Sequence, residues 1–404
     1  MKLALIIDDY LPHSTRVGAK MFHELAVELT RRGHQITVIT PDIRSDKLVT
    51  TECLDGVTIW RFKSGPIKDV GKISRAANES LLSLRGWKAI KNSIQPETFD
   101  GVIYYSPSIF WGGLVKKIKK CCDCPAYLVL RDLFPQWVID AGMLRQGSIF
   151  DKYFRIFERY SYKQADRIGL MSEKNLEIFH VDNKGFPCEV LRNWADITPF
   201  DSFIDNESTL RERLHLNNKI IFFYGGNIGH AQDMANLMRL ARNMSIYENA
   251  HFLFVGQGDE VNLINNLAQE WKLTNFTYLS SVSQSEFKRI LSEVDIGLFS
   301  LSARHTAHNF PGKLLGYMVQ SLPILGSVNV GNDLLDIVNT HHAGFIHING
   351  EDDKLFLSAE RLYAEQTLRI SLGKNAYALL EEQFSVVSAA QNIEMRLEAE
   401  NAVN

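Results

Sequence analysis

The 404-residue sequence lacks the features that mark several large classes of proteins. No apolar run approaches the roughly 20 residues of a membrane-spanning helix. Asp8 and Asp9 follow the first apolar residues too closely for a signal peptide. Five cysteines, an odd number in so long a chain, give no disulfide framework. These absences predict a cytoplasmic protein in a reducing compartment.

Common nucleotide and metal motifs are also missing. The sequence has no GxGxxG fingerprint and no Walker lysine motif, which disfavours nicotinamide and flavin enzymes and ATPases. Cys121, Cys122 and Cys124 cluster, but no second pair of cysteines or histidines stands at a zinc-binding spacing. We therefore expect half-buried thiols leading into a strand, with no metal site and no bound cofactor.

The net charge of −3 hides an uneven distribution of charge. Residues 1–199 hold 29 Lys and Arg against 23 Asp and Glu, whereas residues 200–404 hold 15 against 24. A basic N-terminal half predicts an anionic partner for that half. The segment Lys63–Lys91 interleaves basic and apolar residues, which is typical of a segment on an anionic membrane surface or of a solvated helical flank. Nucleic acid is disfavoured, because the whole chain is acidic and no recognition module is visible.

Short apolar runs alternate with helix-like stretches, the pattern of parallel sheets covered on both faces by helices. A polar, turn-rich stretch at residues 197–218 predicts a linker. We expect an α/β protein of two Rossmann-like domains, residues 1–199 and 200–385, with a cleft between them and a final helix at about 386–400. The predicted strands are Lys2–Ile7, Gln35–Thr40, Gly101–Tyr105, Ala126–Arg131, Arg167–Met171, Glu189–Leu191, Lys219–Tyr224, His251–Val255, Phe276–Leu279, Ile296–Phe299, Pro323–Leu325 and Phe345–Ile348.

The segment Asn309–Ser327 is the most informative local pattern. Pro311 and Gly312 turn the chain into a helix that begins with Lys313 and is anchored by apolar residues from Leu314 onward. The start of a helix offers N–H groups and a partial positive charge, and the lysine adds a full charge. The segment therefore predicts a phosphate site, although a surface lysine beside an ordinary helix gives the same pattern.

Glycine-containing loops follow other predicted strands. Gly18 lies where the first helix begins, and Gly226 and Asn227 belong to a run with three glycines in five residues, a candidate anion cradle. Gly256 and Val282 follow the next two strands, where backbone groups could contact a nucleotide base. Each of these loops is also consistent with a turn that binds nothing.

Charged residues near strand ends supply candidates for chemistry. Asp132 follows the strand Ala126–Arg131 and is expected to orient or deprotonate an acceptor hydroxyl. It is also consistent with a helix cap or a partner for Arg131. Arg304, with two histidines nearby, is a second candidate for a diphosphate contact. Those histidines are His305 and His308.

Several motifs resemble, in chain order, those of the family-4 glycosyltransferases, which have the GT-B fold. They are RGHQITVIT at 32–40, LRNWAD at 191–196, FVGQG at 254–258, VDIG at 294–297 and KLLGYM at 313–318. Three further stretches are similar to a subgroup of L-fucosamine transferases of bacterial O-antigen and capsule pathways. These stretches are RDLFPQW at 131–137, GGNIG at 225–229 and FPGK at 310–313.

The resemblance implies a retaining, metal-independent hexosyltransferase of lipopolysaccharide or capsule biosynthesis. Its donor would be a UDP-linked 6-deoxy amino sugar such as N-acetyl-L-fucosamine, bound by the C-terminal domain. Its acceptor would be a polyprenyl-diphosphate-linked saccharide, bound by the N-terminal domain at the inner face of the membrane, with the final helix packed back on that domain. Departing phosphate can itself take the acceptor proton in a front-face mechanism.

The sequence departs from the family at two acidic positions. The positions of the family's paired glutamates are occupied here by His308 and Gly316, so the contacts of those glutamates with hexose and ribose hydroxyls do not carry over. Lys313 is then the first choice for the charge that builds on the departing diphosphate. Two alternatives remain, a non-hydrolysing nucleotide-sugar 2-epimerase and a non-catalytic sugar-nucleotide-binding subunit.

Overall fold

The computed structural model describes residues 1–14, 16–67, 71–140, 142–200, 208–303 and 311–403. The chain divides into two compact units. The first unit contains Met1–Arg192 and Val386–Asn404, and the second contains Asn193–Ser385. The chain thus passes from the first unit to the second at Arg192, within the LRNWAD motif and before the polar stretch at 197–218.

The first unit is built on an eight-stranded sheet with the order β3-β4-β2-β1-β5-β6-β7-β8. Neighbouring strands pair in parallel, except for the antiparallel pair β3 and β4. Residues such as Leu3 and Ile6 are fully buried, as expected for strands covered on both faces. The strands are β1 Lys2–Ile6, β2 Gln35–Asp42, β3 Val49–Leu54, β4 Val57–Lys63, β5 Gly101–Ser106, β6 Ala126–Leu130, β7 Arg167–Leu170 and β8 Cys188–Val190.

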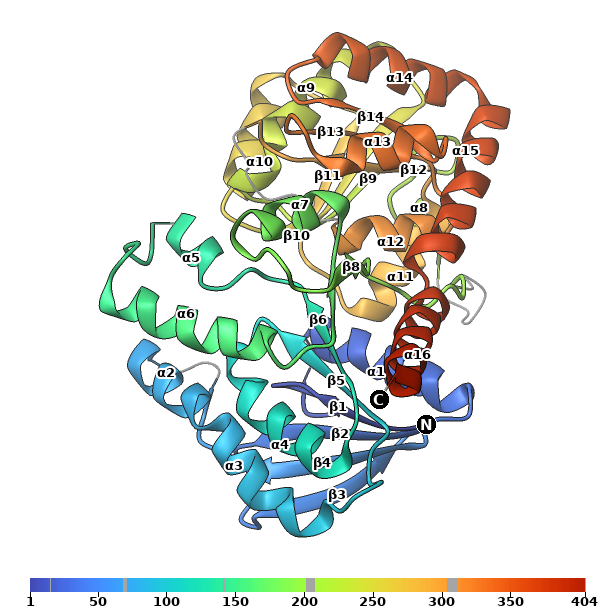
Figure 1. Ribbon diagram of the computed structural model, residues 1–404. Coiled ribbons are helices and arrows are strands. Elements are labelled where there is room, and N and C mark those ends of the chain that lie inside the picture. Colours follow the sequence, from blue (N-terminus) through green and yellow to red (C-terminus); the bar gives the residue numbers. More distant parts are fainter. Residues whose placement is uncertain (15, 68–70, 141, 201–207, 304–310, 404) are drawn as a thin grey trace. The chain divides into compact units, whose positions relative to one another are not determined.

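Helices cover both faces of this sheet (Figure 1). α1 packs against α16. α4 packs against both α3 and α6. Glu394 of α16 ties this helix to the end of α1, because it accepts hydrogen bonds from Arg32 Nε at 2.7 Å and from His34 Nε2 at 3.0 Å. The helices are α1 Val17–Arg31, α2 Lys72–Ser80, α3 Leu82–Ile90, α4 Gly112–Cys122, α5 Gln136–Asp140, α6 Ile149–Tyr162, α7 Glu173–Asp182 and α16 Val386–Val403, with short 3₁₀ turns at Lys91–Ser93 and Ile109–Trp111.

The second unit contains a six-stranded parallel sheet with the order β11-β10-β9-β12-β13-β14. Its strands are β9 Ile220–Asn227, β10 Ala250–Gln257, β11 Phe276–Leu279, β12 Ile296–Ser300, β13 Ile324–Val328 and β14 Gly344–Ile348. Its helices are α8 Leu210–Arg213, α9 Met234–Asn243, α10 Val261–Glu270, α11 Gln284–Glu293, α12 Gly312–Val319, α13 Asp333–Thr340, α14 Asp352–Ala364 and α15 Gln366–Leu379, with 3₁₀ turns at His230–Gln232 and Met244–Ile246 and a π-helical turn at Leu380–Phe384.

Apolar side chains fill both faces of the second sheet. Phe222 of β9 stacks on Phe252 of β10 with ring centroids 4.8 Å apart. On the other face, Phe223 packs edge to face with Tyr317 of α12 at 6.1 Å. The hydroxyl of Tyr317 accepts a 3.2 Å hydrogen bond from the N–H of Gly225. α12 is therefore fixed against β9, close to the end of that strand.

The structure confirms the predicted α/β class with two parallel-sheet domains. The antiparallel pair β3 and β4 was not among the predicted strands. Two predicted loop positions were wrong. Gly256 was expected to follow its strand, but it lies within β10. Gly225–Asn227 was expected to be a loop, but it forms the end of β9 and pairs with Val255–Gln257 of β10.

None of the helices in the described ranges is long and apolar enough to cross a membrane. The same ranges hold no cluster of three or more metal-ligating side chains.

Cys122 and Cys124 are buried beside β6, and burial raises the pKa of both thiols, to about 12 for Cys124. They are thus packed thiols next to a strand.

Candidate functional site

Lys313 lies near the carboxyl edge of the second sheet, in the first turn of α12. Its Nζ donates a 2.7 Å hydrogen bond to the Tyr224 hydroxyl and lies 4.0 Å from the centroid of the same ring. The ring of Phe299 is 5.8 Å away. Burial lowers the pKa of Lys313 to about 7. No carboxylate among the described residues lies within ion-pair distance, so aromatic rings hold this amine, and with a pKa of about 7 it is only partly charged at neutral pH.

Gly226 leaves open the space in front of this ammonium. A Cβ placed on Gly226 would lie 3.5 Å from Lys313 Nζ, and the φ of Gly226 is +120°. A side chain at this position would be strained and would crowd the lysine. The lysine therefore faces bare backbone at the end of β9.

Gly256 and Gly258 serve the pairing of strands. A Cβ on Gly256 would come within 1.8 Å of the Gly226 oxygen, and one on Gly258 within 2.1 Å of the Ile228 oxygen. These glycines allow β9 and β10 to remain close up to their ends. The anion cradle predicted at Gly225–Gly229 is therefore mostly extended strand at the carboxyl end of β9.

The chain just beyond β9 is tied to the chain beyond β10. Asn227 Nδ2 donates to Gln232 Oε1 at 2.9 Å. His230 Nδ1 lies 2.8 Å from Glu260 Oε1, and this hydrogen bond raises the pKa of the exposed imidazole. Glu260 also accepts a hydrogen bond from the Met234 N–H at 3.2 Å. Glu260 and Tyr224 were not predicted from the sequence, although Tyr224 stands two residues before the candidate Gly226 and Glu260 four residues after the candidate Gly256.

The remaining predicted residues of this unit have different surroundings. Val282 follows β11 and packs against the core, while the neighbouring Ser281 Oγ donates to Gln257 Oε1 at 3.2 Å. Leu314 is fully buried, so its side chain is unavailable to a ligand. Pro311 is the N-cap of α12 without a side-chain cap, and Gly312 is exposed. Arg304, His305 and His308 lie outside the described residues.

A second group of predicted residues lies at the carboxyl edge of the first sheet. A Cβ on Gly18 would lie 3.1 Å from the Tyr105 hydroxyl, so the start of α1 approaches that ring closely. Burial raises the pKa of Tyr105, and the charges of Asp8 and Asp132 raise it further. Burial also raises the pKa of Asp132, against the influence of Arg131. The edge thus brings Gly18 and Asp132 to the same tyrosine.

Arg131 has partners of its own. Its guanidinium donates to the carbonyl oxygen of Leu191 and, at 3.0 Å, to that of Arg192. It therefore holds the chain where the first unit ends. Ser172 caps α7 by accepting a hydrogen bond from the Asn175 N–H at 3.2 Å.

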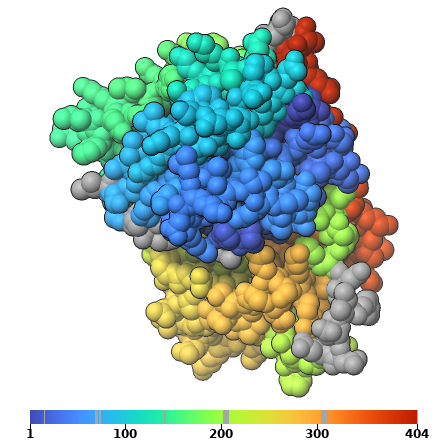
Figure 2. Space-filling model, turned by 90° about the horizontal axis from the view of Figure 1, so that it is seen from below, coloured from blue at the N-terminus to red at the C-terminus, as the bar shows by residue number. Residues whose placement is uncertain are grey.

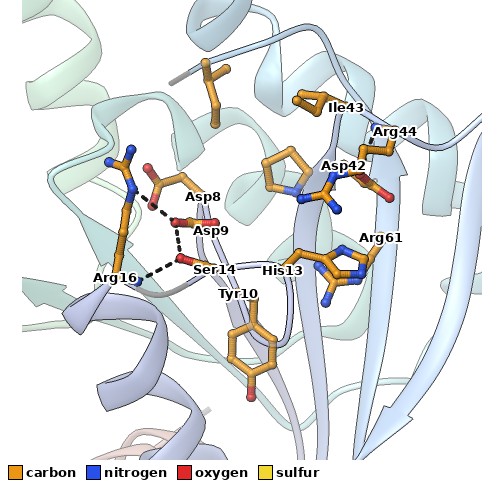
Figure 3. A pocket seen from close by; sticks show the side chains of 12 residues that line it. Asp8, Asp9, Tyr10, His13, Ser14, Arg16, Asp42, Ile43, Arg44 and Arg61 are labelled. Carbon is orange, nitrogen blue, oxygen red and sulfur yellow. Dashed lines mark hydrogen bonds and ion pairs between the residues drawn. The ribbon is translucent and has the colours of Figure 1, made fainter. Parts of the chain in front are cut away.

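A polar cavity of about 360 Å³ opens beside this edge (Figure 3). On one side, Asp9 accepts a hydrogen bond from Ser14 at 2.6 Å and lies 3.6 Å from Arg16 Nε. Buried Arg61 lines another side and donates to Glu52 at 2.8 Å. The cavity is lined by Asp8, Asp9, Tyr10, His13, Ser14, Arg16, Pro41, Asp42, Ile43, Arg44, Arg61 and Ile67.

None of these side chains was predicted as a binding group. They belong partly to the loop DDYLPHSTR after the first strand, where only Gly18, just beyond it, was predicted to contact a ligand. Asp42 is the last residue of β2, and Arg44 follows that strand. Position after a parallel strand was the signal that could have found them.

Comparisons with known proteins agree with this architecture. Residues 205–379 match the family model described as "Glycosyl transferases group 1". The chain is 23% identical over 223 residues to WbjE of Pseudomonas aeruginosa, named as a glycosyltransferase, and the alignment covers 54% of each protein. It is 24% identical over 323 residues to WcaI of Escherichia coli (strain K12), named as a colanic acid biosynthesis glycosyl transferase, covering 74% of this chain and 76% of WcaI.

Solved structures match the chain over its whole length. Sucrose-phosphate synthase from Thermosynechococcus elongatus matches with a TM-score of 0.70 at 15% identity, covering all of both chains. HepE of Anabaena, in complex with UDP and glucose, matches with a TM-score of 0.66 at 14% identity, covering 99% of this chain and 100% of HepE. The chain has the GT-B fold, and the match to the glycosyl transferases group 1 model lies within its second unit.

Proposed function

We propose that this protein is a retaining glycosyltransferase that uses a UDP-linked sugar as donor and a polyprenyl-diphosphate-linked saccharide as acceptor. The observation that carries the proposal is Lys313, a cation without a described carboxylate partner, inside the unit that matches the group 1 glycosyltransferases. The sugar, a 6-deoxy amino sugar such as N-acetyl-L-fucosamine, follows from the motif resemblance. O-antigen or capsule synthesis is then the process served.

The donor is assigned to the second unit. When the bond to the leaving group breaks, negative charge builds on the diphosphate, and a fixed cation nearby lowers the barrier. Lys313 can supply that charge without a metal ion, and the start of α12 adds N–H groups and a partial positive charge. HepE, which shares the fold, is described in complex with UDP and glucose. This supports a uridine nucleotide as the first donor to test.

The acceptor is assigned to the first unit. This unit carries 30 Lys and Arg against 25 Asp and Glu, whereas the second carries 14 against 22. A basic unit suits an acceptor that bears a diphosphate. Asp132, beside Tyr105, is the carboxylate that we assign to orienting the acceptor hydroxyl. The relative WcaI is named for colanic acid biosynthesis, which supports a polysaccharide acceptor. We place the protein in the cytoplasm, at the inner face of the membrane.

A direct assay can test the proposal. Labelled UDP-sugars are incubated with polyprenyl-diphosphate-linked saccharides, beginning with a UDP-linked 6-deoxy amino sugar, and products are separated by charge and lipid content. We expect a labelled lipid-linked product that forms only when donor and acceptor are both present. Epimerised donor in the absence of acceptor would replace the proposal by the 2-epimerase. Donor binding without turnover across the panel would instead indicate a sugar-nucleotide-binding subunit.

A further inference from the structure

The outer face of α6 carries a stripe of exposed apolar side chains. Ile149, Tyr153, Ile156 and Tyr160 follow one another at helical spacing, and we call them the α6 stripe. Ile149 is 85% exposed and Ile156 is 67% exposed. Four such residues on one short helix form a contiguous patch, which monomeric proteins usually avoid in water.

The neighbouring face of α6 is used for packing. Phe157 lies 5.0 Å from Phe110, and Phe154 lies 5.0 Å from Phe134, measured between ring centroids. Tyr153 joins this group, since its ring centroid lies 5.0 Å from that of Phe157. The part of the α6 stripe that is most exposed to solvent is therefore Ile149 and Ile156.

The acidic residues of α6 are buried, whereas basic residues on and beside this helix are exposed. Both acidic residues, Asp151 and Glu158, are buried, and each lies within 3.4 Å of Arg155. Lys152, Arg159 and Lys163 are exposed beside the stripe. The outer face consequently combines apolar and basic side chains and has no acidic residue from α6.

Neighbouring helices extend this basic surface. Lys116 of α4 lies 6.0 Å from the ring centroid of Tyr160, and Lys117 lies 5.2 Å from that of Trp87 in α3. The Tyr153 hydroxyl lies 2.6 Å from Ser80 Oγ at the end of α2. Figure 2 shows α3 and α4, in light blue to teal, as one continuous surface with the green atoms of α6 at its margin.

The sequence left two alternatives open for the segment Lys63–Lys91, a membrane contact and a solvated helical flank. Ile67 and Leu82 are buried in the core, and Trp87 is half-buried, while Leu84 remains 62% exposed. Ile67 and Leu82 thus stabilise the fold. The more exposed apolar side chains are those of α6, and the segment supplies basic side chains beside them.

We propose that the α6 stripe and its basic flank bind the surface of an anionic lipid bilayer. Apolar side chains with Lys and Arg beside them suit the boundary between headgroups and acyl chains, where burial of apolar area and attraction to anionic lipids act together. The choice of a bilayer rests on the proposed function, because a lipid-linked acceptor requires the enzyme to work at that surface.

The test is flotation of the full chain with vesicles of phosphatidylethanolamine and phosphatidylglycerol, compared with vesicles of phosphatidylcholine. The double variant Ile149→Gln with Ile156→Gln is expected to reduce partitioning roughly tenfold or more. Lys152→Gln with Lys163→Gln is expected to reduce it about tenfold on anionic vesicles only. The matched control is Ile246→Gln with Ile370→Gln, two exposed isoleucines of the second unit at 73% and 51% exposure, which should float like the wild type.

Equal flotation of the Ile149/Ile156 variant and the wild type would overturn the assignment, as would a wild-type chain that does not float. A concentration-dependent dimer in gel filtration, lost in that variant without any flotation, would assign the stripe to a second copy of the chain. UDP binding and transfer to an acceptor without a lipid tail are measured in parallel. Failure of those two assays with flotation intact would count against the proposed function and leave the bilayer surface standing.

Discussion

The hydroxyl of Tyr224 accepts a 2.7 Å hydrogen bond from Lys313, whose ammonium also lies 4.0 Å from the centroid of the same ring. One aromatic residue thus fixes the position of the lysine. Tyr224 is fully buried and belongs to β9, so this position is set by the sheet. A diphosphate at the start of α12 would meet a cation that is already placed.

Replacing the lysine tests this charge most directly. Lys313→Ala is expected to lower the rate of single turnover by about 10²–10³, because it removes the cation that stabilises the leaving diphosphate. Thermal unfolding should change little, since the Lys313 ammonium forms no ion pair with a described carboxylate. Lys354→Ala, at an exposed lysine of the same unit, is the control and should be neutral. Near-normal turnover of Lys313→Ala would remove this residue from the mechanism.

Donor affinity should depend on pH through the same lysine. The pKa of Lys313 is about 7 in the free protein, well below its usual value, because the ammonium is buried. A bound diphosphate favours the charged form, so above this pH the complex takes up a proton as it forms. Affinity is then expected to be constant below about pH 7 and to fall by up to about tenfold per pH unit above it.

Calorimetry of UDP-sugar binding in buffers of different ionisation enthalpy measures that proton uptake. Lys313→Arg, which stays charged throughout, should show no uptake. An unchanged pH profile in this variant would assign the dependence to another group.

The close approach of β9 and β10 predicts a sharp contrast between two glycines. In Gly256→Ala the new Cβ would stand 1.8 Å from the Gly226 oxygen, at a φ of +158°, so the strands must separate. We expect a loss of about 2–4 kcal/mol in unfolding free energy. Gly312→Ala meets nothing within 4 Å and should change stability by less than about 1 kcal/mol. Denaturant unfolding of both variants measures this difference. Similar unfolding midpoints for the two variants would contradict the close approach of the strands.

Glu394 should govern the attachment of α16. Burial raises its pKa, but hydrogen bonds from Arg32 and His34 outweigh this and leave the pKa lowered overall. A lowered pKa means that the carboxylate stabilises the fold above its unfolded pKa, and that this contribution is lost as the pH falls through the folded value. Glu394→Ala is expected to speed hydrogen exchange along α16 at neutral pH and much less in acid. The exposed Glu398→Ala serves as control; equal exchange in both variants would refute the role.

Much of the fold could be predicted from local sequence pattern. Runs such as Leu3–Ile6 and Phe252–Val255 are apolar throughout because both faces of a parallel sheet are covered. The pair of β3 and β4 was not predicted, because Val49–Leu54 has no continuous run of buried residues. Its alternation of half-buried and exposed positions resembles that of a polar connection.

The candidate site could be predicted only in part. Lys313 was visible because a helix start beside a lysine is a local pattern. Its partner Tyr224 is distant in sequence and is brought to it by the pairing of β9 with β12. The acidic and basic lining of the cavity in the first unit comes from three separate strand ends, which no single motif records. The α6 stripe was missed because apolar residues at helical spacing usually indicate a buried face.

The two passages of the chain between the units lie side by side. Ala195 pairs in parallel with Ser385, and its N–H donates to the Phe384 oxygen at 2.9 Å. The second unit therefore begins and ends at nearly the same point, as an inserted domain does. It could therefore be exchanged as a whole, by grafting residues 193–385 of a relative between Arg192 and Val386. If the second unit binds the donor as we propose, such a graft would change donor specificity and leave the first unit unchanged.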